Sequence, residues 1–256
     1  MKNPTRNKSA IILAAGVGRR LTSWEGPKTL LTFDGQSLLE RHLRFLADLG
    51  IENVEITAGH CADELRAEVD RLGPDCRVTL IENPNYQAGS LLSLACHDAL
   101  LRSGQSILLM DGDVLYARAI LQRLVQSNRP NALLVDRELE DDEEPVKICF
   151  VQEQIVDFHK VPKRPYEWAG ESVGFFKFAP DIAYRLADRA KKLIAEGNSN
   201  YEYEEAIRSL ILEMPGDFGA EDISGLPWTE IDFDHDVNRA NSTIVPQLQR
   251  RHEGAQ

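Results

Sequence analysis

Short apolar segments alternate with amphipathic segments along the first half of the chain, and this alternation limits the fold more than any other feature. Four segments are predicted as strands, at 10–14, 54–58, 77–81 and 106–110. Segments with the helical spacing of apolar residues lie between them, at 36–49, 62–72 and 91–102. Because the predicted strands are continuously apolar, they belong in a parallel sheet that helices cover on both faces. The sequence therefore predicts an α/β fold with a Rossmann-like mixed, mainly parallel sheet flanked by helices.

The second half of the chain predicts strands of mixed orientation. Expected strands lie at 147–151, 154–159 and 172–178, expected helices at 182–195 and 203–212, and a final short strand at 227–232. A helix from about Asp236 follows, and Asp234 and Asp236 are expected to cap its amino terminus. The acidic run at 138–144 is interpreted as a solvated loop. No repeat or low-complexity linker divides the chain, so we expect a single domain over 1–256.

The composition bounds the class of protein. A formal net charge of -12 at pH 7 argues against a nucleic-acid surface and for a soluble protein. No apolar run approaches the roughly 20 residues that a bilayer span needs, and the amino-terminal MKNPTRNKSA lacks the apolar core of a secretory signal. The four cysteines are scattered and lack metal-binding spacing, so reduced thiols are expected. We therefore expect a cytoplasmic protein without nucleic-acid or membrane partners, and the sequence leaves a homodimer open.

A glycine-rich basic loop follows the first predicted strand. Gly16 and Gly18 allow a tight turn with bare backbone N–H groups, and Arg20 and Lys28 place cations close to it. Ligands bind at the carboxyl edge of such sheets, so a polyanion is the expected guest. Leu21 stands where the dinucleotide fingerprint requires a third glycine, and the spacing before Lys28 fits no P-loop. For the Gly-x-Gly pattern alone, a basic surface loop is the alternative.

Carboxylates mark the ends of two predicted strands. Asp111 and Asp113 bracket a glycine after the most apolar strand, where a buried unpaired aspartate would be costly. Binding of Mg²⁺ by carboxylate oxygens is the functional interpretation, and an Asp-Gly turn is the alternative. In the late strand, Glu230 and Asp232 face one way and Ile231 the other. One or both of these acidic residues can therefore face a metal.

The run LxAGxGxRL at 13–21, followed by Pro27-Lys28, resembles the nucleotide-sugar pyrophosphorylase-like nucleotidyltransferases, which have a GT-A-like fold. The strand end MDGDV at 110–114 and the tail PWTEID at 227–232 resemble members of this group that are cytidylyltransferases for phosphocholine, 2-aminoethylphosphonate and inositol phosphate. The resemblance implies a nucleotide-binding half at about 8–135 and an acceptor-binding half at about 136–256.

The resemblance and the residue chemistry together assign roles to individual side chains. The expected Mg²⁺ ligands are Asp113 and Asp232, and Glu230 is a weaker candidate. The expected catalytic cations are Arg20, Lys28 and Lys160. The expected nucleotide-binding residues are Leu13, Ala14, Ala15, Gly16, Gly18, Lys28, Ser90 and Asp111. The expected acceptor-binding residues are Glu171, Tyr203, Trp228 and Glu230, and with Trp168 they form an aromatic and acidic set suited to an ammonium group. Two alternatives stay open: an exposed strand-end lysine for Lys160 and a core position on a helix for Tyr203.

These assignments predict Mg²⁺-dependent transfer of CMP from CTP to a small phospho- or phosphono-alcohol or amine of the phosphocholine or 2-aminoethylphosphonate type. An acceptor oxygen would attack the α-phosphorus in line, and pyrophosphate would leave. Because that oxygen is anionic at neutral pH, positioning and charge neutralisation suffice without a general base. The alternatives are a sugar-1-phosphate nucleotidyltransferase and a non-catalytic nucleotide-binding regulatory subunit of the same fold.

Overall fold

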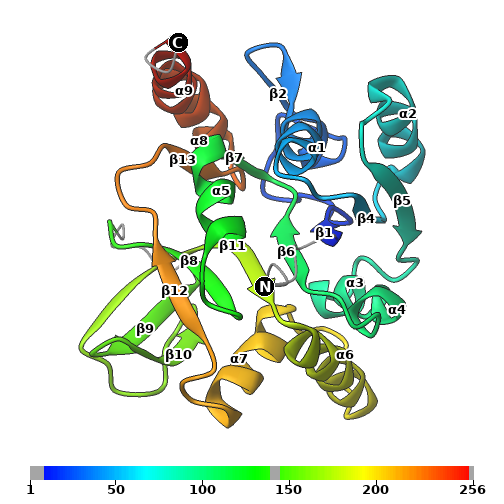
Figure 1. Ribbon diagram of the computed structural model, residues 1–256. Coiled ribbons are helices and arrows are strands. Elements are labelled where there is room, and N and C mark those ends of the chain that lie inside the picture. The colour runs from blue at the N-terminus through cyan, green and yellow to red at the C-terminus, as the bar shows by residue number, and fades with distance from the viewer. Residues whose placement is uncertain (1–8, 139–144, 254–256) are drawn as a thin grey trace, which may run out of the picture.

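The computed structural model describes residues 9–138 and 145–253, with side chains as far as residue 250. Residues 139–144 of the acidic run and residues 1–8 at the amino terminus lie outside this description, together with the expectations placed on them. Among the described residues, nine strands form one sheet in the order β10-β9-β11-β6-β1-β4-β5, with β8 beside β11 and β12 beside β8 (Figure 1). Helices flank this sheet, and the expected α/β fold is confirmed.

The elements have the following bounds. The strands of the large sheet are β1 (Ser9–Leu13), β4 (Asn53–Ala58), β5 (Arg77–Glu82), β6 (Ile107–Asp111), β8 (Ala132–Asp136), β9 (Lys147–Val151), β10 (Gln154–His159), β11 (Trp168–Phe178) and β12 (Gly219–Asp222). Two small pairs are β2 (Thr32–Phe33) with β3 (Gln36–Ser37), and β7 (Val114–Tyr116) with β13 (Trp228–Glu230). The helices are α1 (Leu38–Asp48), α2 (Ala62–Leu72), α3 (Ser90–Ala95), α4 (Asp98–Leu101), α5 (Arg118–Gln126), α6 (Pro180–Ala195), α7 (Glu204–Glu213), α8 (Asp234–Arg239) and α9 (Val245–Glu253), with a 3₁₀ turn η1 (Lys28–Leu30) and a π-helical turn η2 (Ala240–Ile244).

The parallel part of the sheet brings two predicted ligand-binding segments to one edge. Strands β6, β1, β4 and β5 run parallel, and Leu13 at the end of β1 lies opposite Asp111 at the end of β6. Strand β11 runs antiparallel to β6 and also pairs with β8 and β9, so it joins the second half of the chain to the first. The carboxyl ends of β1 and β6 therefore open toward residues from both halves.

Helices cover both faces of the sheet because apolar side chains of the strands alternate between two hydrophobic clusters. On β1, Ala10 and Ile12 pack with leucines and isoleucines of α1, α2 and α5. Ile11 points to the opposite face and packs with apolar residues of α3, α6 and α7. Burial on both faces explains why β1 and β6 read as continuous apolar runs, whereas β5 at the edge of the sheet is partly exposed.

The structure departs from several predicted boundaries. The helix expected at 91–102 breaks into α3 and α4, and the buried ring of His97 at the break lies 2.6 Å from Thr57 Oγ1 and 2.7 Å from Glu55 Oε2. The helix expected from residue 36 begins at Leu38, because the hydroxyl of Ser37 accepts a hydrogen bond from the N–H of Glu40 and caps it. The late strand stops at Glu230, so Asp232 lies beyond it. Within residues 9–138 and 145–253, no helix has the length and apolar character that a bilayer span needs.

A buried ion pair ties β10 and the segment that follows it to α7. The carboxylate of Asp157 is fully buried and accepts hydrogen bonds from the backbone N–H groups of Phe158, Lys163 and Arg164. Arg208 on α7 donates to the same carboxylate at 2.7 Å. These contacts anchor the segment that begins at Lys160, which reaches the pocket described below.

We expect the substitution Asp157→Ala to lower the free energy of unfolding by about 2 to 4 kcal/mol, because it removes the acceptor of three backbone donors and leaves the partly buried guanidinium of Arg208 to the carboxylate of Glu205, at 3.7 Å. Urea denaturation followed by circular dichroism measures the change. Asp188→Ala is the matched control, since Asp188 pairs with Arg102 at the exposed surface and should contribute little. Equal losses in both variants would contradict the anchoring role of Asp157.

Candidate active site

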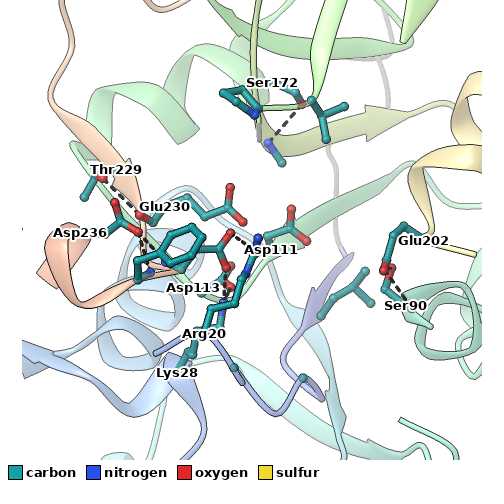
Figure 2. Close-up of a pocket in the computed structure, with 18 of the residues that line it drawn as sticks. Arg20, Lys28, Ser90, Asp111, Asp113, Ser172, Glu202, Thr229, Glu230 and Asp236 are labelled. Atoms are coloured by element: carbon teal, nitrogen blue, oxygen red, sulfur yellow. Dashed lines mark hydrogen bonds and ion pairs between the residues drawn. The ribbon is translucent and has the colours of Figure 1, made fainter. Parts of the chain in front are cut away.

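A pocket of about 520 Å³ opens at the carboxyl ends of β1 and β6. Residues from distant parts of the chain line it, as Figure 2 shows for Arg20 and Lys28 near the amino terminus, Asp113 after β6 and Glu230 from the late strand. The basic loop, the acidic strand end and the late strand thus share one cavity.

Backbone contacts pack the glycine-rich loop closely against its surroundings. Gly18 has a φ of +64°, and a Cβ there would lie 3.0 Å from the side chain of Lys28. The N–H of His60 donates to the carbonyl of Ala15, and Gly59 approaches that carbonyl so closely that a Cβ would lie 2.7 Å from it. Glycine is therefore required at these positions for geometric reasons.

Three carboxylates, from the turn before β7 and from the end of β13 and the segment after it, come together in the pocket. Asp113, Glu230 and Asp232 each offer an oxygen, and these atoms lie within 4.8 Å of one another. The antiparallel pair β7–β13 produces this arrangement, because it places Val114 opposite Glu230 and lets the N–H of Ile231 donate to the carbonyl of Asp113. Oxygen donors in such a cluster suit a hard divalent cation.

The ammonium of Lys28 lies between two of these carboxylates. Its Nζ is 2.6 Å from Asp113 Oδ2 and 2.7 Å from Asp232 Oδ1, and Arg20 donates to the other oxygen of Asp232 at 2.5 Å. Burial alone would lower the pKa of Lys28, but the carboxylates of Asp113 and Asp232 outweigh it and raise that pKa. For Asp232, burial works to raise the pKa, and the charges of Lys28 and Arg20 lower it below its usual value. The site therefore favours a charged Lys28 against an ionised Asp232.

A second acidic group forms the pocket wall beside Asp111. The hydroxyl of Tyr203 donates to Asp111 Oδ2 at 2.7 Å, and burial together with the charge of Glu204 raises the pKa of Asp111. Burial also raises the pKa of Glu204 to about 7. Within the described residues, Glu204 Oε2 is a buried atom without a hydrogen-bond partner. On this wall, burial and mutual repulsion therefore favour protonated carboxyl groups, and a positive charge placed beside them would favour their ionised forms.

Ser90 connects the start of α3 to the segment before α7. Its hydroxyl donates to Glu202 Oε2 at 2.5 Å and accepts a hydrogen bond from the N–H of Tyr203 at 2.9 Å (Figure 2). Gly89 packs so tightly that a Cβ would lie 2.5 Å from the carbonyl of Tyr201. The two halves of the chain therefore meet at this wall of the pocket.

The profile of a protein family described as the MobA-like NTP transferase domain matches residues 10–163, which is more than half of the chain. The chain belongs to this family. The resemblance to nucleotidyltransferases is therefore confirmed, and the matched region of this MobA-like NTP transferase contains the glycine-rich loop, Asp111 and Asp113.

Individual curated proteins match most of this chain. A bifunctional IPC transferase and DIPP synthase of Rubrobacter xylanophilus is 26% identical over 239 residues, which cover 92% of this chain and 52% of that protein. A CMP-5'-(3-aminopropyl)phosphonate synthase of Streptomyces rubellomurinus is 26% identical over 254 residues, which cover 94% of this chain and 40% of that protein. The chain thus spans about half the length of these relatives or less.

Solved structures share the fold. The inositol-1-phosphate CTP transferase from T. maritima has a TM-score of 0.76 at 21% identity, with 99% of each chain covered. The CTP:phosphocholine cytidylyltransferase from Streptococcus pneumoniae has a TM-score of 0.71 at 20% identity, covering 90% of this chain and 96% of that one.

The structure places nearly all sequence-predicted site residues of this MobA-like NTP transferase on the pocket wall. The lining residues include Leu13, Ala15, Gly16, Gly18, Arg20, Lys28, Ser90, Asp111, Asp113, Lys160, Glu171, Tyr203, Trp228, Glu230 and Asp232. The exception is Ala14, which packs against the hydrophobic cluster behind the loop. Tyr203 is a core residue through its ring, which is buried, while its hydroxyl reaches Asp111 at the pocket wall. Its role in binding the acceptor stays a prediction.

Two predicted aromatic residues have structural partners that limit their exposure to a ligand. The indole N–H of Trp228 donates to Asp136 Oδ2 at 2.7 Å, and the residue is only 8% exposed. Trp168 is absent from the pocket lining and stacks on Phe150 with ring centroids 3.9 Å apart. The aromatic contribution expected for the acceptor side is therefore smaller than the sequence predicted.

The structure also shows contacts that sequence reasoning missed. Asp234, expected as a helix cap, instead accepts hydrogen bonds from Thr22 and Ser23 and so holds the segment after the glycine-rich loop. Asp236 does act at the helix start, where its carboxylate accepts from the N–H groups of Asp232 and Phe233. The sequence could not separate these two roles of Asp234, because an aspartate at the start of a helix can cap that helix or bind a distant segment.

Gly174 on β11 lies directly against the acidic wall, and its replacement tests that packing. Its φ is +75°, and a Cβ there would lie 2.0 Å from Asp111 Oδ2. We expect Gly174→Ala to cost about 1 to 3 kcal/mol more in unfolding free energy than Gly35→Ala. Gly35 is the matched control, because its φ is +74° and a Cβ there meets nothing within 4 Å, so it reports backbone strain alone. Equal losses in urea denaturation would mean that Asp111 moves aside freely.

Proposed function

We propose that this chain is a divalent-metal-dependent cytidylyltransferase that moves CMP from CTP to a small phosphorylated or phosphonate acceptor and releases pyrophosphate. The observation that carries this proposal is the meeting of Arg20 and Lys28 with the carboxylates of Asp113, Glu230 and Asp232 in one pocket. Family membership supports the reaction type. We further propose that the two halves of the chain act as one catalytic domain.

The residues present fit a metal ion. Asp113 and Asp232, with Glu230 beside them, would hold Mg²⁺ through carboxylate oxygens. A bound Mg²⁺ would neutralise negative charge on the triphosphate and act as a Lewis acid there. Mg²⁺ is preferred over larger ions in this proposal because it combines few carboxylates with substrate phosphates.

The chain's own cations and backbone would do the remaining work. Lys28 and Arg20, which balance the carboxylates in this structure, would turn to the phosphates of the nucleotide, and the loop at Gly16 and Gly18 would offer backbone N–H groups. Lys160 lines the same pocket from the second half. The acceptor's anionic oxygen forms the new P–O bond at the α-phosphorus while the bond to pyrophosphate breaks. No proton has to leave the nucleophile, so no histidine is required.

Support for CTP and for an amine-bearing acceptor comes from different sources. The choice of cytidine rests on the resemblance of the strand end MDGDV and of the PWTEID tail, and the relative from Streptomyces rubellomurinus is named for a CMP product. For the acceptor, the support is the acidic wall at Asp111 and Glu204, where a buried carboxylate oxygen lacks a partner. The positive charge of a primary or quaternary ammonium beside this wall would favour ionised carboxylates there, whereas a neutral polyol supplies no charge. Phosphocholine and 2-aminoethylphosphonate are therefore the preferred acceptor types.

Pyrophosphate release tests the reaction and the role of Lys28. We expect release with CTP, Mg²⁺ and an acceptor, and a loss of about 30- to 1000-fold in kcat/KM for Lys28→Ala, because a charge-assisted contact in the transition state is worth about 2 to 4 kcal/mol. Asp113→Ala should abolish metal-dependent turnover. Lys191→Ala serves as the control, because Lys191 is an exposed residue of α6 that pairs with Asp98 of α4. Nucleotide binding without turnover for any nucleoside triphosphate would favour the non-catalytic subunit.

Acceptor choice can be tested separately with Glu204→Gln. We expect this variant to raise KM for 2-aminoethylphosphonate about tenfold or more, because it removes a carboxylate that can become negatively charged beside the ammonium, with KM for CTP unchanged. Glu205→Gln is the matched control, since Glu205 faces His159 and Arg208 and is absent from the pocket lining. Preference of the wild-type protein for inositol 1-phosphate or a sugar 1-phosphate would overturn the amine assignment and leave the reaction type intact.

A further inference from the structure

A fully buried histidine stands behind the acidic strand end, outside the pocket lining. His42 lies on α1, and its Nε2 is 3.2 Å from the carbonyl oxygen of Gly112, the residue between Asp111 and Asp113. Its Nδ1 is 3.2 Å from the hydroxyl of Tyr116 on β7. The ring packs edge-on to Phe175, with centroids 6.1 Å apart. A polar side chain at this depth needs both of its ring nitrogens satisfied, and both are.

The chemistry of the two partners defines the state of the ring. Burial lowers the pKa of His42 to about 4, so the imidazole is neutral near pH 7. A carbonyl oxygen can only accept, so Nε2 carries the hydrogen and donates it to Gly112. The hydroxyl of Tyr116 then donates to Nδ1. One tautomer therefore satisfies the carbonyl of Gly112 and links it to α1.

Gly112 is held from two sides. Its N–H donates to the carbonyl of Leu13 at 3.0 Å, and a Cβ at this position would lie 2.9 Å from the same carbonyl. The bond from His42 holds the next peptide, which joins Gly112 to Asp113, through the carbonyl of Gly112. After the side chain of Asp113, the carbonyl of Asp113 accepts a hydrogen bond from the N–H of Ile231. The backbone that carries Asp113 is thus clamped by α1, β1 and the late strand.

We propose that His42 is a positioning residue that holds the Asp113 carboxylate in its metal-binding place through the carbonyl of Gly112. The proposal rests on the proposed function, because it takes Asp113 as a metal ligand. His42 itself touches neither substrate nor metal. Without its N–H, the carbonyl of Gly112 is buried and unsatisfied, and the peptide before Asp113 loses one of the three contacts that hold it against the carboxylate cluster.

Metal binding by the folded protein tests this directly, with Mn²⁺ as the probe and electron paramagnetic resonance as the readout in the presence of CTP. We expect His42→Phe, which keeps a ring but removes the donor, to weaken Mn²⁺ binding about tenfold or more. His42→Gln should restore most of the affinity, because its amide N–H can reach the place of Nε2. The half-saturating Mg²⁺ concentration for turnover should rise in parallel, and kcat at saturating Mg²⁺ should change less.

Tyr116→Phe separates positioning from stability. It removes the bond to Nδ1 and leaves the bond to Gly112, so we expect lower stability with Mn²⁺ affinity within about twofold of wild type. Equal loss of Mn²⁺ affinity in Tyr116→Phe and His42→Phe, or unchanged affinity in His42→Phe, would overturn the proposal. If His42→Phe does not fold, His42→Asn replaces it: its shorter amide cannot reach Gly112, so it should bind Mn²⁺ more weakly than His42→Gln, and equal affinities would overturn the proposal.

The same titration distinguishes this inference from the proposed function. A wild-type protein that binds no Mn²⁺ with CTP, or binds it equally after Asp113→Asn, would refute the metal site itself. A wild-type protein that binds Mn²⁺ through Asp113 while His42→Phe binds it equally well would refute only the positioning role.

Discussion

The ion pairs of Lys28 with Asp113 and Asp232 are the contacts on which the rest of this site depends. The two aspartates lie far apart in the sequence, yet a single ammonium lies within 2.7 Å of both. With Glu230 close by, three acidic side chains share a small volume, which costs free energy unless a cation is present. Lys28 supplies that cation, and burial strengthens the attraction because little water screens it. In the proposed function, part of this contact would be exchanged for a metal ion and the phosphates of a nucleotide.

The fold serves this cluster by bringing three distant segments to one edge of the sheet. Parallel pairing of β1 with β6 puts the glycine-rich loop beside Asp111, and the small pair β7–β13 adds Glu230 and Asp232. Strand β11 bends at Gly174 where it passes the acidic wall, which explains a left-handed glycine inside a long strand. The opposite side of the pocket belongs to Ser90 and the segment before α7, where both halves of the chain touch. Backbone hydrogen bonds, and not side-chain contacts alone, therefore hold each of these segments at the site.

Local patterns predicted much of this architecture, and pairing between distant segments accounts for what they missed. Strands β1, β4, β5 and β6 were predicted from their apolar residues, and the acidic residues after two predicted strands pointed to the carboxylate cluster. Strand β7 escaped prediction because three residues after a turn become a strand only through β13, more than a hundred positions later. The break before α4 follows from His97 reaching Thr57, a contact that helical periodicity cannot contain. The role of Asp234 was missed for the same reason, since its partners Thr22 and Ser23 lie at the other end of the chain.

A crystal structure with CTP and Mn²⁺, analysed by anomalous diffraction, would show whether Asp113 and Asp232 share one metal ion. We expect an anomalous peak within coordination distance of both Asp113 and Asp232, with the ammonium of Lys28 moved from the carboxylates to the phosphates of the nucleotide. An ion held elsewhere, or CTP bound with Lys28 still between the two aspartates, would contradict this expectation.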